Sequence, residues 1–237
     1  LTDGRYMAGF GLGLGGAGEP RGKLPGPQRD MAHEAVDLIL KAWTSPEPFD
    51  WNGTYWQGRN WKIIPKPFTR PRMDVGMAVS RSDTSAQLAA QKGFLPLMSW
   101  SNTGGYLGGL IKTYLETESP DDPPTRERVR VGKYIYVCDT IAEAKRDLHD
   151  ADLGSARNRL DEFLPKGKQR AELTIDDLID SGCFIVGPPD RVTKMLMEYY
   201  EECGGFGTLL LLAGKDWATP EKRERSMRAI MSEVAPK

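Results

Sequence analysis

The chain is short of the residues that build metal centres and disulfide frameworks. Its 237 residues include three cysteines and two histidines. Cys138, Cys183 and Cys203 are widely spaced and odd in number, so they match neither a disulfide framework nor a zinc-binding pattern. His33 and His149 cannot build a multi-histidine metal centre on their own. We therefore expect no metal site, and a reducing, cytoplasmic environment for the protein.

An excess of one charge and long apolar runs are also missing. The 32 basic side chains are balanced by 33 acidic ones, which gives a net charge of −1. A protein that tracks a phosphate backbone normally carries a broad basic surface. The longest obvious apolar run, residues 209–213, is far shorter than the roughly 18 residues that span a bilayer. We expect neither nucleic acid nor a membrane as a partner.

Expected strands and helices alternate along the whole chain. Such alternation favours an α/β fold in which parallel strands are joined by crossover helices. Five units of roughly 45 residues fill this chain, whereas a closed eight-stranded barrel takes about 250 residues. Either the sheet is open, or three units precede Leu1. The expected strands are residues 6–14, 75–79, 94–99, 128–138 and 206–213, and the expected helices are 29–43, 85–92, 104–115, 140 to about 164, 175–181, a helix from 189, and 220–234.

Residues 47–72 interrupt this alternation. Asn52-Gly53 is a hairpin turn signal with aromatic residues on both sides, so we expect a hairpin excursion between barrel elements. Four tryptophans around it are open to two interpretations. They pack the hairpin against the barrel, or they form a stacking platform for a sugar or base, as in a lectin-like binding module. The four are Trp43, Trp51, Trp56 and Trp61.

The glycines of residues 11–16 match the pattern G-x-G-x-x-G after an expected strand. They lead into a proline-rich loop, however, and the acidic residues about 20 positions on, Glu34 and Asp37, lie inside an expected helix. A dinucleotide fold places that acidic residue at the end of a second strand. We therefore interpret the segment either as a flexible loop or as a loop that closely approaches a bound cofactor.

The turn at residues 80–85 contains the sequence Ser-Arg-Ser-Asp-Thr-Ser between an expected strand and a helix. Backbone N–H groups at a helix N-terminus, hydroxyl groups and an arginine together suit a phosphate. The simpler alternative is that Ser82 or Asp83 only caps the helix. Trp100, at the end of the next expected strand, either flanks a planar ligand or packs against its neighbours. The candidate cofactor-binding residues of this turn are Ser80, Arg81, Ser82 and Ser85.

Five motifs in order resemble the bacterial luciferase-like flavin monooxygenases. Residues 1–11 are similar to the family signature L-S-x-G-R-F-x-x-G-x-G. Arg29, Glu34 and Trp43 match its R…E-A-L-x-I-L…W segment, and residues 53–67 match its hairpin connection. Residues 80–100 keep the length and character of its phosphate-turn unit. Residues 187–190 and 204–212 look most like the limonene monooxygenase-like branch.

This resemblance implies a TIM-type (β/α)8 barrel that binds FMN at the carboxyl ends of its strands. The chain would then be one domain over residues 1–237, carrying strands four to eight, with the first three units upstream. By position, Arg29, Ser82 and Ser85 match phosphate-contacting residues, and Trp100 matches an aromatic residue near the flavin ring. Arg81 departs from the family, because luciferases carry a glutamate there. Leu12 likewise replaces a second phosphate-binding arginine.

The resemblance also implies the chemistry. Reduced flavin, supplied from NADH or NADPH directly or through a separate reductase, reacts with O₂, and the resulting flavin hydroperoxide inserts one oxygen atom into a small apolar organic substrate. A homodimer is expected. The family's catalytic histidine belongs to an early strand, so no catalytic residue is assigned here. Two alternatives stay open: a deazaflavin-dependent oxidoreductase that transfers hydride, and a non-catalytic flavin-binding barrel subunit.

Overall fold

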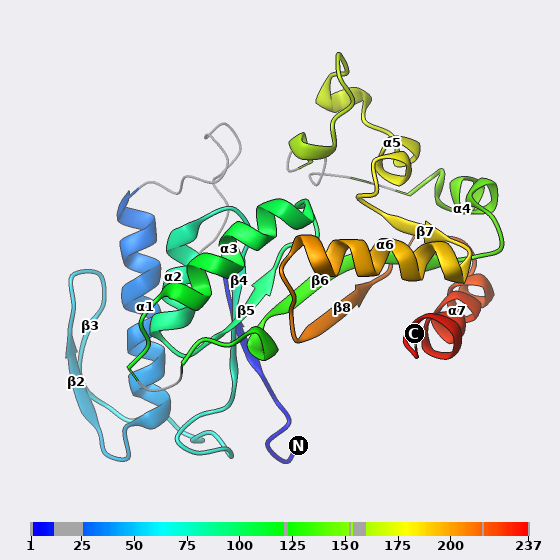
Figure 1. Ribbon diagram of the computed structural model, residues 1–237. Helices are drawn as coiled ribbons and strands as arrows, with labels where there is room; N and C mark the ends of the chain where they lie inside the picture. The colour runs from blue at the N-terminus through cyan, green and yellow to red at the C-terminus, as the bar shows by residue number, and fades with distance from the viewer. Residues whose placement is uncertain are drawn as a thin grey trace.

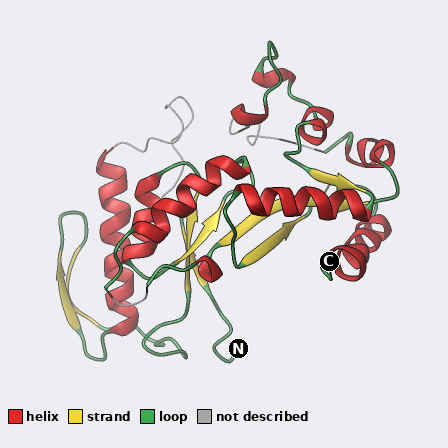
Figure 2. Ribbon diagram, in the orientation of Figure 1, coloured by secondary structure: helices red, strands yellow, loops and turns green. Residues whose placement is uncertain are grey.

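The computed structural model describes residues 2–11, 26–120, 123–151, 153, 160–214 and 216–236. Six parallel strands form its main sheet (Figures 1 and 2). Five of them, β1, β4, β5, β6 and β8, lie side by side in chain order, so the expected parallel arrangement is confirmed. Within the described residues, β1 and β8 each pair on one edge alone, and the sheet is open. The strands are β1 (Ala8–Phe10), β4 (Val75–Val79), β5 (Leu95–Met98), β6 (Arg130–Val137), β7 (Ile185–Gly187) and β8 (Thr208–Leu212).

The longer helices follow the strands of this sheet. Figure 1 shows α3 and α6 crossing in front of β5, β6 and β8, and both helices contribute to one large core with β4 and β5. Val131 of β6 belongs to this large core as well. Because side chains alternate along a strand, Ile135 and Val137 face α6 and the C-terminal helix, whereas Tyr134 and Tyr136 face the opposite side. The helices are α1 (Gly26–Thr44), α2 (Asp83–Gln91), α3 (Gly104–Glu116), α6 (Pro189–Glu202) and α7 (Pro220–Ala229), the last continuing as the π-helix η5 (Ile230–Val234).

The segment between β6 and β7 differs from the expectation. Its first helix, α4 (Ile141–Leu148), begins at Thr140, whose side chain accepts a hydrogen bond from Glu143 N (3.0 Å). It ends at Leu148 and not near residue 164. Leu160 and Phe163 are buried in a core that this segment shares with Tyr136 of β6 and with Trp217, and the chain turns back to bury them. It does so through η3 (Asp161–Phe163), η4 (Arg170–Glu172) and α5 (Ile175–Asp180), while η1 (Arg126–Arg128) precedes β6.

The sequence pattern missed β7 and overestimated β1. The three residues of β7 pair with residues 135–137 of β6, directly after the part of β6 that pairs with β8. Strand β1 covers residues 8–10; residues 6, 7 and 11 of the expected 6–14 lie outside the strand, and residues 12–14 lie outside the described part of the chain. Most of the glycine-rich segment at 11–16 lies outside the described residues. Among the described residues, no helix is long and apolar enough to cross a membrane.

The expected hairpin excursion is present as strands β2 (Phe49–Asn52) and β3 (Gln57–Trp61), which pair antiparallel. Glu34 of α1 fixes its turn, because its carboxylate accepts hydrogen bonds from the backbone N–H groups of residues 54–56 and from Trp51 Nε1. A side chain at Gly53 would collide with that carboxylate. Trp43, in turn, stacks on Phe10 with ring centroids 5.9 Å apart. These contacts favour packing of the hairpin over a ligand platform.

Acid should destabilise the segment between β6 and β7. Burial opposes ionisation of Asp177, yet Lys168 Nζ (2.6 Å) and Thr174 hold its pKa at about 2. A carboxyl group whose pKa is lowered by folding stabilises the protein above its unfolded pKa of about 3.9 and loses that contribution as the pH falls through the folded value. We expect the Tm to fall between about pH 4 and pH 2, and less steeply in Asp177→Asn. Identical acid limbs for both proteins in thermal unfolding would contradict this.

Candidate functional site

The turn between β4 and α2 presents the hydroxyl group that the sequence predicts. Val75, Met77 and Val79 are buried and anchor β4, and α2 begins directly after the turn. Ser82 is the N-cap residue with extended backbone (φ −127°, ψ 120°), but its side chain makes no capping hydrogen bond. The interpretation that Ser82 only caps the helix therefore loses its main support. Its hydroxyl lies next to the positive end of the α2 dipole, where an anion is stabilised.

Ser85 lies one turn further along α2. It is buried, with 8% of its surface exposed, and its backbone N–H donates to Ser82 O (3.0 Å). Ser80, Ser82 and Ser85 thus occupy one short stretch of chain at the carboxyl end of β4. This edge is where ligands bind in parallel α/β sheets.

Two residues that the sequence analysis missed hold the turn from the α3 side. The Asn102 side-chain amide donates to Ser80 O, and Tyr106 Oη donates to Arg81 O (3.2 Å). Asn102 is fully buried, and the first bond is partly buried. The carbonyl groups of Ser80 and Arg81 are thereby held by the loop after β5 and by α3. No short sequence motif predicts these two hydrogen bonds, because the residues that they join lie 22 and 25 positions apart in the chain.

Arg81 and Arg29 differ in where the structure places them. Arg81 Nη1 lies 3.9 Å from Asp161 Oδ2, so the turn contacts the segment between β6 and β7. Arg29 lies in the first turns of α1 and is half-buried. No hydrogen bond or ion pair among the described residues joins Arg29 to Ser82 or Ser85. Its role toward a phosphate therefore stays a prediction.

Trp100 belongs to an aromatic cluster at the carboxyl ends of β5, β6 and β8. Its ring is 4.7 Å from that of Tyr134 in an edge-to-face arrangement. Phe184 lies 5.1 Å from Tyr134 and 5.2 Å from Trp217. The centroid distances fall in the range of favourable aromatic pairs. Trp100 thus packs against its neighbours, while one side of its ring borders a cavity.

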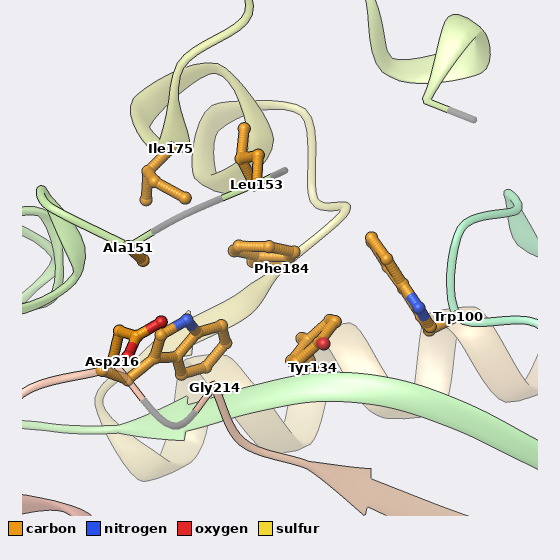
Figure 3. Close-up of a pocket in the computed structure, with 9 residues that line it drawn as sticks. Trp100, Tyr134, Ala151, Leu153, Ile175, Phe184, Gly214 and Asp216 are labelled. Atoms are coloured by element: carbon orange, nitrogen blue, oxygen red, sulfur yellow. The ribbon is translucent and has the colours of Figure 1, made fainter. Parts of the chain in front are cut away.

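This cavity, about 60 Å³ in volume, opens between Trp100 and the segment before β7 (Figure 3). Its volume is well below the roughly 300–1,000 Å³ of pockets that enclose drug-sized ligands. The residues described here therefore accept a small apolar group and do not enclose a three-ring cofactor. The lining is apolar apart from Tyr134 and Asp216; the remaining residues are Trp100, Ala151, Leu153, Ile175, Phe184, Gly214 and Trp217.

The described residues hold no group of three or more histidine, cysteine or acidic side chains arranged to bind a metal ion. The chemically distinctive features are instead a hydroxyl-lined helix N-terminus and an apolar, aromatic cavity, both at the carboxyl edge of a parallel sheet. Together they define an α/β protein with a parallel sheet whose ligand edge suits a phosphate-bearing cofactor and an apolar molecule.

The chain belongs to the luciferase-like monooxygenase family, whose model matches residues 1–205. Its fold is accordingly of the luciferase-like TIM-barrel type. It is 25% identical to 3,6-diketocamphane 1,6-monooxygenase of Pseudomonas putida, with all of this chain and 73% of that protein aligned. It is also 25% identical to limonene 1,2-monooxygenase of Rhodococcus erythropolis, over all of this chain and 62% of that protein. Across the five curated relatives, the chain spans 62–73% of their length.

Solved structures agree with this fold. The oxygenating constituent of Pseudomonas putida 3,6-diketocamphane monooxygenase, a type II Baeyer-Villiger monooxygenase in complex with FMN, superposes with a TM-score of 0.70 at 25% identity, covering 88% of this chain and 63% of that one. An F420-dependent secondary alcohol dehydrogenase superposes with a TM-score of 0.57 at 16% identity, covering 86% and 62%. The relatives of this chain are monooxygenases, and the same fold also holds a deazaflavin.

Proposed function

We propose that this chain is the FMN-binding part of a monooxygenase that inserts one atom of O₂ into a small apolar organic substrate. The observation that carries the proposal is the Ser82 side chain at the start of α2, which makes no capping hydrogen bond, in a family with an FMN-bound member of the same fold. Reduced FMN, when bound, supplies the electrons and reacts with O₂. NADH or NADPH would supply those electrons, directly or through a separate reductase.

The residues present fit a flavin phosphate. Ser82 and Ser85 offer hydroxyl groups, the first N–H groups of α2 offer a favourable dipole, and Arg81 offers positive charge at the same turn. We assign the phosphate to this turn and keep Arg29 as a further candidate contact. The anchoring of the turn by Asn102 and Tyr106 keeps these groups in place before the cofactor arrives.

The aromatic cavity would accept an apolar group of the substrate. Trp100 would flank the flavin ring and Tyr134 would bound the substrate, so water is kept away from the reacting oxygen. Exclusion of water matters because reduced oxygen species otherwise escape as H₂O₂ without forming product. The proposed reactants are therefore O₂ and a small apolar organic molecule. The expected homodimer is also part of the proposal.

We further propose that three more strands complete the barrel between β8 and β1. Strand β8 supports this, because Leu210 and Leu211 are 39% and 45% exposed and its outer edge has no partner within the described part of the chain. Apolar strand edges of this kind are normally paired or covered in a folded protein. Strands four to eight of the barrel would then be β1, β4, β5, β6 and β8.

Isotope labelling distinguishes the proposed oxygenation from its alternatives. We expect the complete protein, given reduced FMN, ¹⁸O₂ and limonene as a probe alkene, to release a product with one ¹⁸O atom. Mass spectrometry of the product measures this directly. Anaerobic turnover with reduced F420 and no incorporated label would instead establish hydride transfer. Flavin binding without turnover across a panel of alkenes and cyclic ketones would favour the non-catalytic subunit.

A further inference from the structure

A carboxylate lies between two arginines beside the proposed phosphate turn. Asp161 begins η3 in the segment between β6 and β7. Its Oδ2 is 3.9 Å from Arg81 Nη1, and its Oδ1 is 2.5 Å from Arg170 Nε. The guanidinium group that would serve a phosphate is therefore paired with a negative charge supplied by the protein itself.

The position of Asp161 is set by the core and not by a loose surface loop. Phe163, two residues further on, is buried, and its ring lies 5.4 Å from Lys133 Nζ. Lys133 is itself 1% exposed, with Nζ 4.3 Å from the ring of Tyr199. Both distances are those of cation–π contacts. A buried lysine on β6 thus seats η3 at a fixed place.

Tyr199 also connects this buried lysine to the phosphate turn. Tyr199 Oη donates to Asn102 O (3.4 Å), and the Asn102 side chain donates to Ser80 O. The turn and η3 are therefore joined twice, once through this buried chain of contacts and once through the ion pair of Arg81 with Asp161. The fold therefore places η3 beside the β4–α2 turn, and the Asp161 carboxylate lies next to Arg81 of that turn.

We propose that Asp161 competes with the flavin phosphate for Arg81 and thereby weakens FMN binding. The inference rests on the proposed function, because it takes the β4–α2 turn as the phosphate site. A phosphate dianion at this turn and the Asp161 carboxylate repel each other, and the guanidinium group must divide between them. Weaker binding suits a flavin that arrives reduced from another protein and leaves after oxidation.

Replacement of Asp161 tests the competition. In the complete protein, we expect Asp161→Asn to bind FMN about three- to fivefold more tightly, as for loss of a partly exposed charge interaction, with riboflavin affinity unchanged. Asp180→Asn is the matched control, since Asp180 pairs with Lys145 (2.8 Å) in the same segment and should leave both affinities unchanged. Quenching of flavin fluorescence at low ionic strength measures each dissociation constant.

The outcomes separate this inference from the proposed function. Unchanged or weaker FMN binding by Asp161→Asn overturns the competition, and so does an equal change for riboflavin. Asp161→Ser is measured in parallel, so that a folding defect of one variant, seen as a lowered Tm, does not decide the matter. If the unsubstituted protein binds neither FMN nor riboflavin, the proposed function itself fails.

Discussion

Replacing both Ser82 and Ser85 by alanine is expected to weaken FMN binding at least about tenfold and to leave riboflavin binding nearly unchanged. Each substitution removes a hydrogen bond to a charged phosphate, a contact that contributes roughly 1.5–3 kcal/mol. About 1.4 kcal/mol corresponds to a factor of ten in affinity. Riboflavin lacks the phosphate, so its affinity reports on the rest of the site. Parallel titrations of the two flavins with the complete protein measure the difference.

A nearby hydroxyl group provides the control for this variant. Thr113 of α3 donates to Asp83 Oδ1 (3.1 Å) at the first residue of α2. Thr113→Ala therefore removes a hydroxyl group that contacts the same helix from outside the turn, and we expect FMN binding to be unaffected. Equal losses of FMN and riboflavin affinity in the double serine variant would indicate damage to the fold. The assignment of the phosphate to this turn would then be wrong.

Phe184→Ala is expected to destabilise the protein by about 3–5 kcal/mol, the usual range for deletion of a buried phenylalanine ring. Phe184 is 2% exposed and contacts Trp100, Tyr134 and Trp217 at centroid distances of 5.1–6.1 Å. Its loss leaves a void and removes aromatic pairs that join β5, β6 and the loop after β8. Urea unfolding monitored by tryptophan fluorescence measures the free energy of unfolding.

Phe184→Leu separates the loss of volume from the loss of aromatic contacts. It keeps most of the buried volume, so we expect a cost below about 1.5 kcal/mol, as for other near-isosteric core exchanges. If both variants unfold at the urea concentration of the unsubstituted protein, the aromatic cluster does not hold the ligand edge together. The cavity beside Trp100 would then be an incidental gap between side chains.

Local sequence patterns predicted the order of the sheet because each strand and helix carries its own periodicity. The hairpin at 47–72 follows from the Asn52-Gly53 turn signal, and the structure has both this hairpin and the helix expected at 104–115. β7 escaped prediction because three residues, Ile185–Gly187, are too few to show a period. The prediction of a helix running to residue 164 was wrong for another reason. Burial of Leu160 and Phe163 in a separate core outweighs the helical propensity of the charged stretch.

Some residues of the candidate site were likewise predictable from the sequence and others were not. The serines and Arg81 of the turn stand together in the sequence, so their common location was predictable. Their partners were not, since Tyr106 and Asp161 come from 25 and 80 residues further along the chain. The burial of Lys133 was not predictable either, because lysine side chains normally face solvent. Only the packing of Phe163 and Tyr199 shows that it is buried.

A structure of the complete protein with FMN shows where the flavin phosphate binds. We expect it at the start of α2, within hydrogen-bond distance of the Ser82 and Ser85 hydroxyl groups. The ring would lie at the carboxyl edge of the sheet, bordered by Trp100. A phosphate bound elsewhere, with the turn at residues 80–85 making no contact with the cofactor, would show that this turn is not the phosphate site.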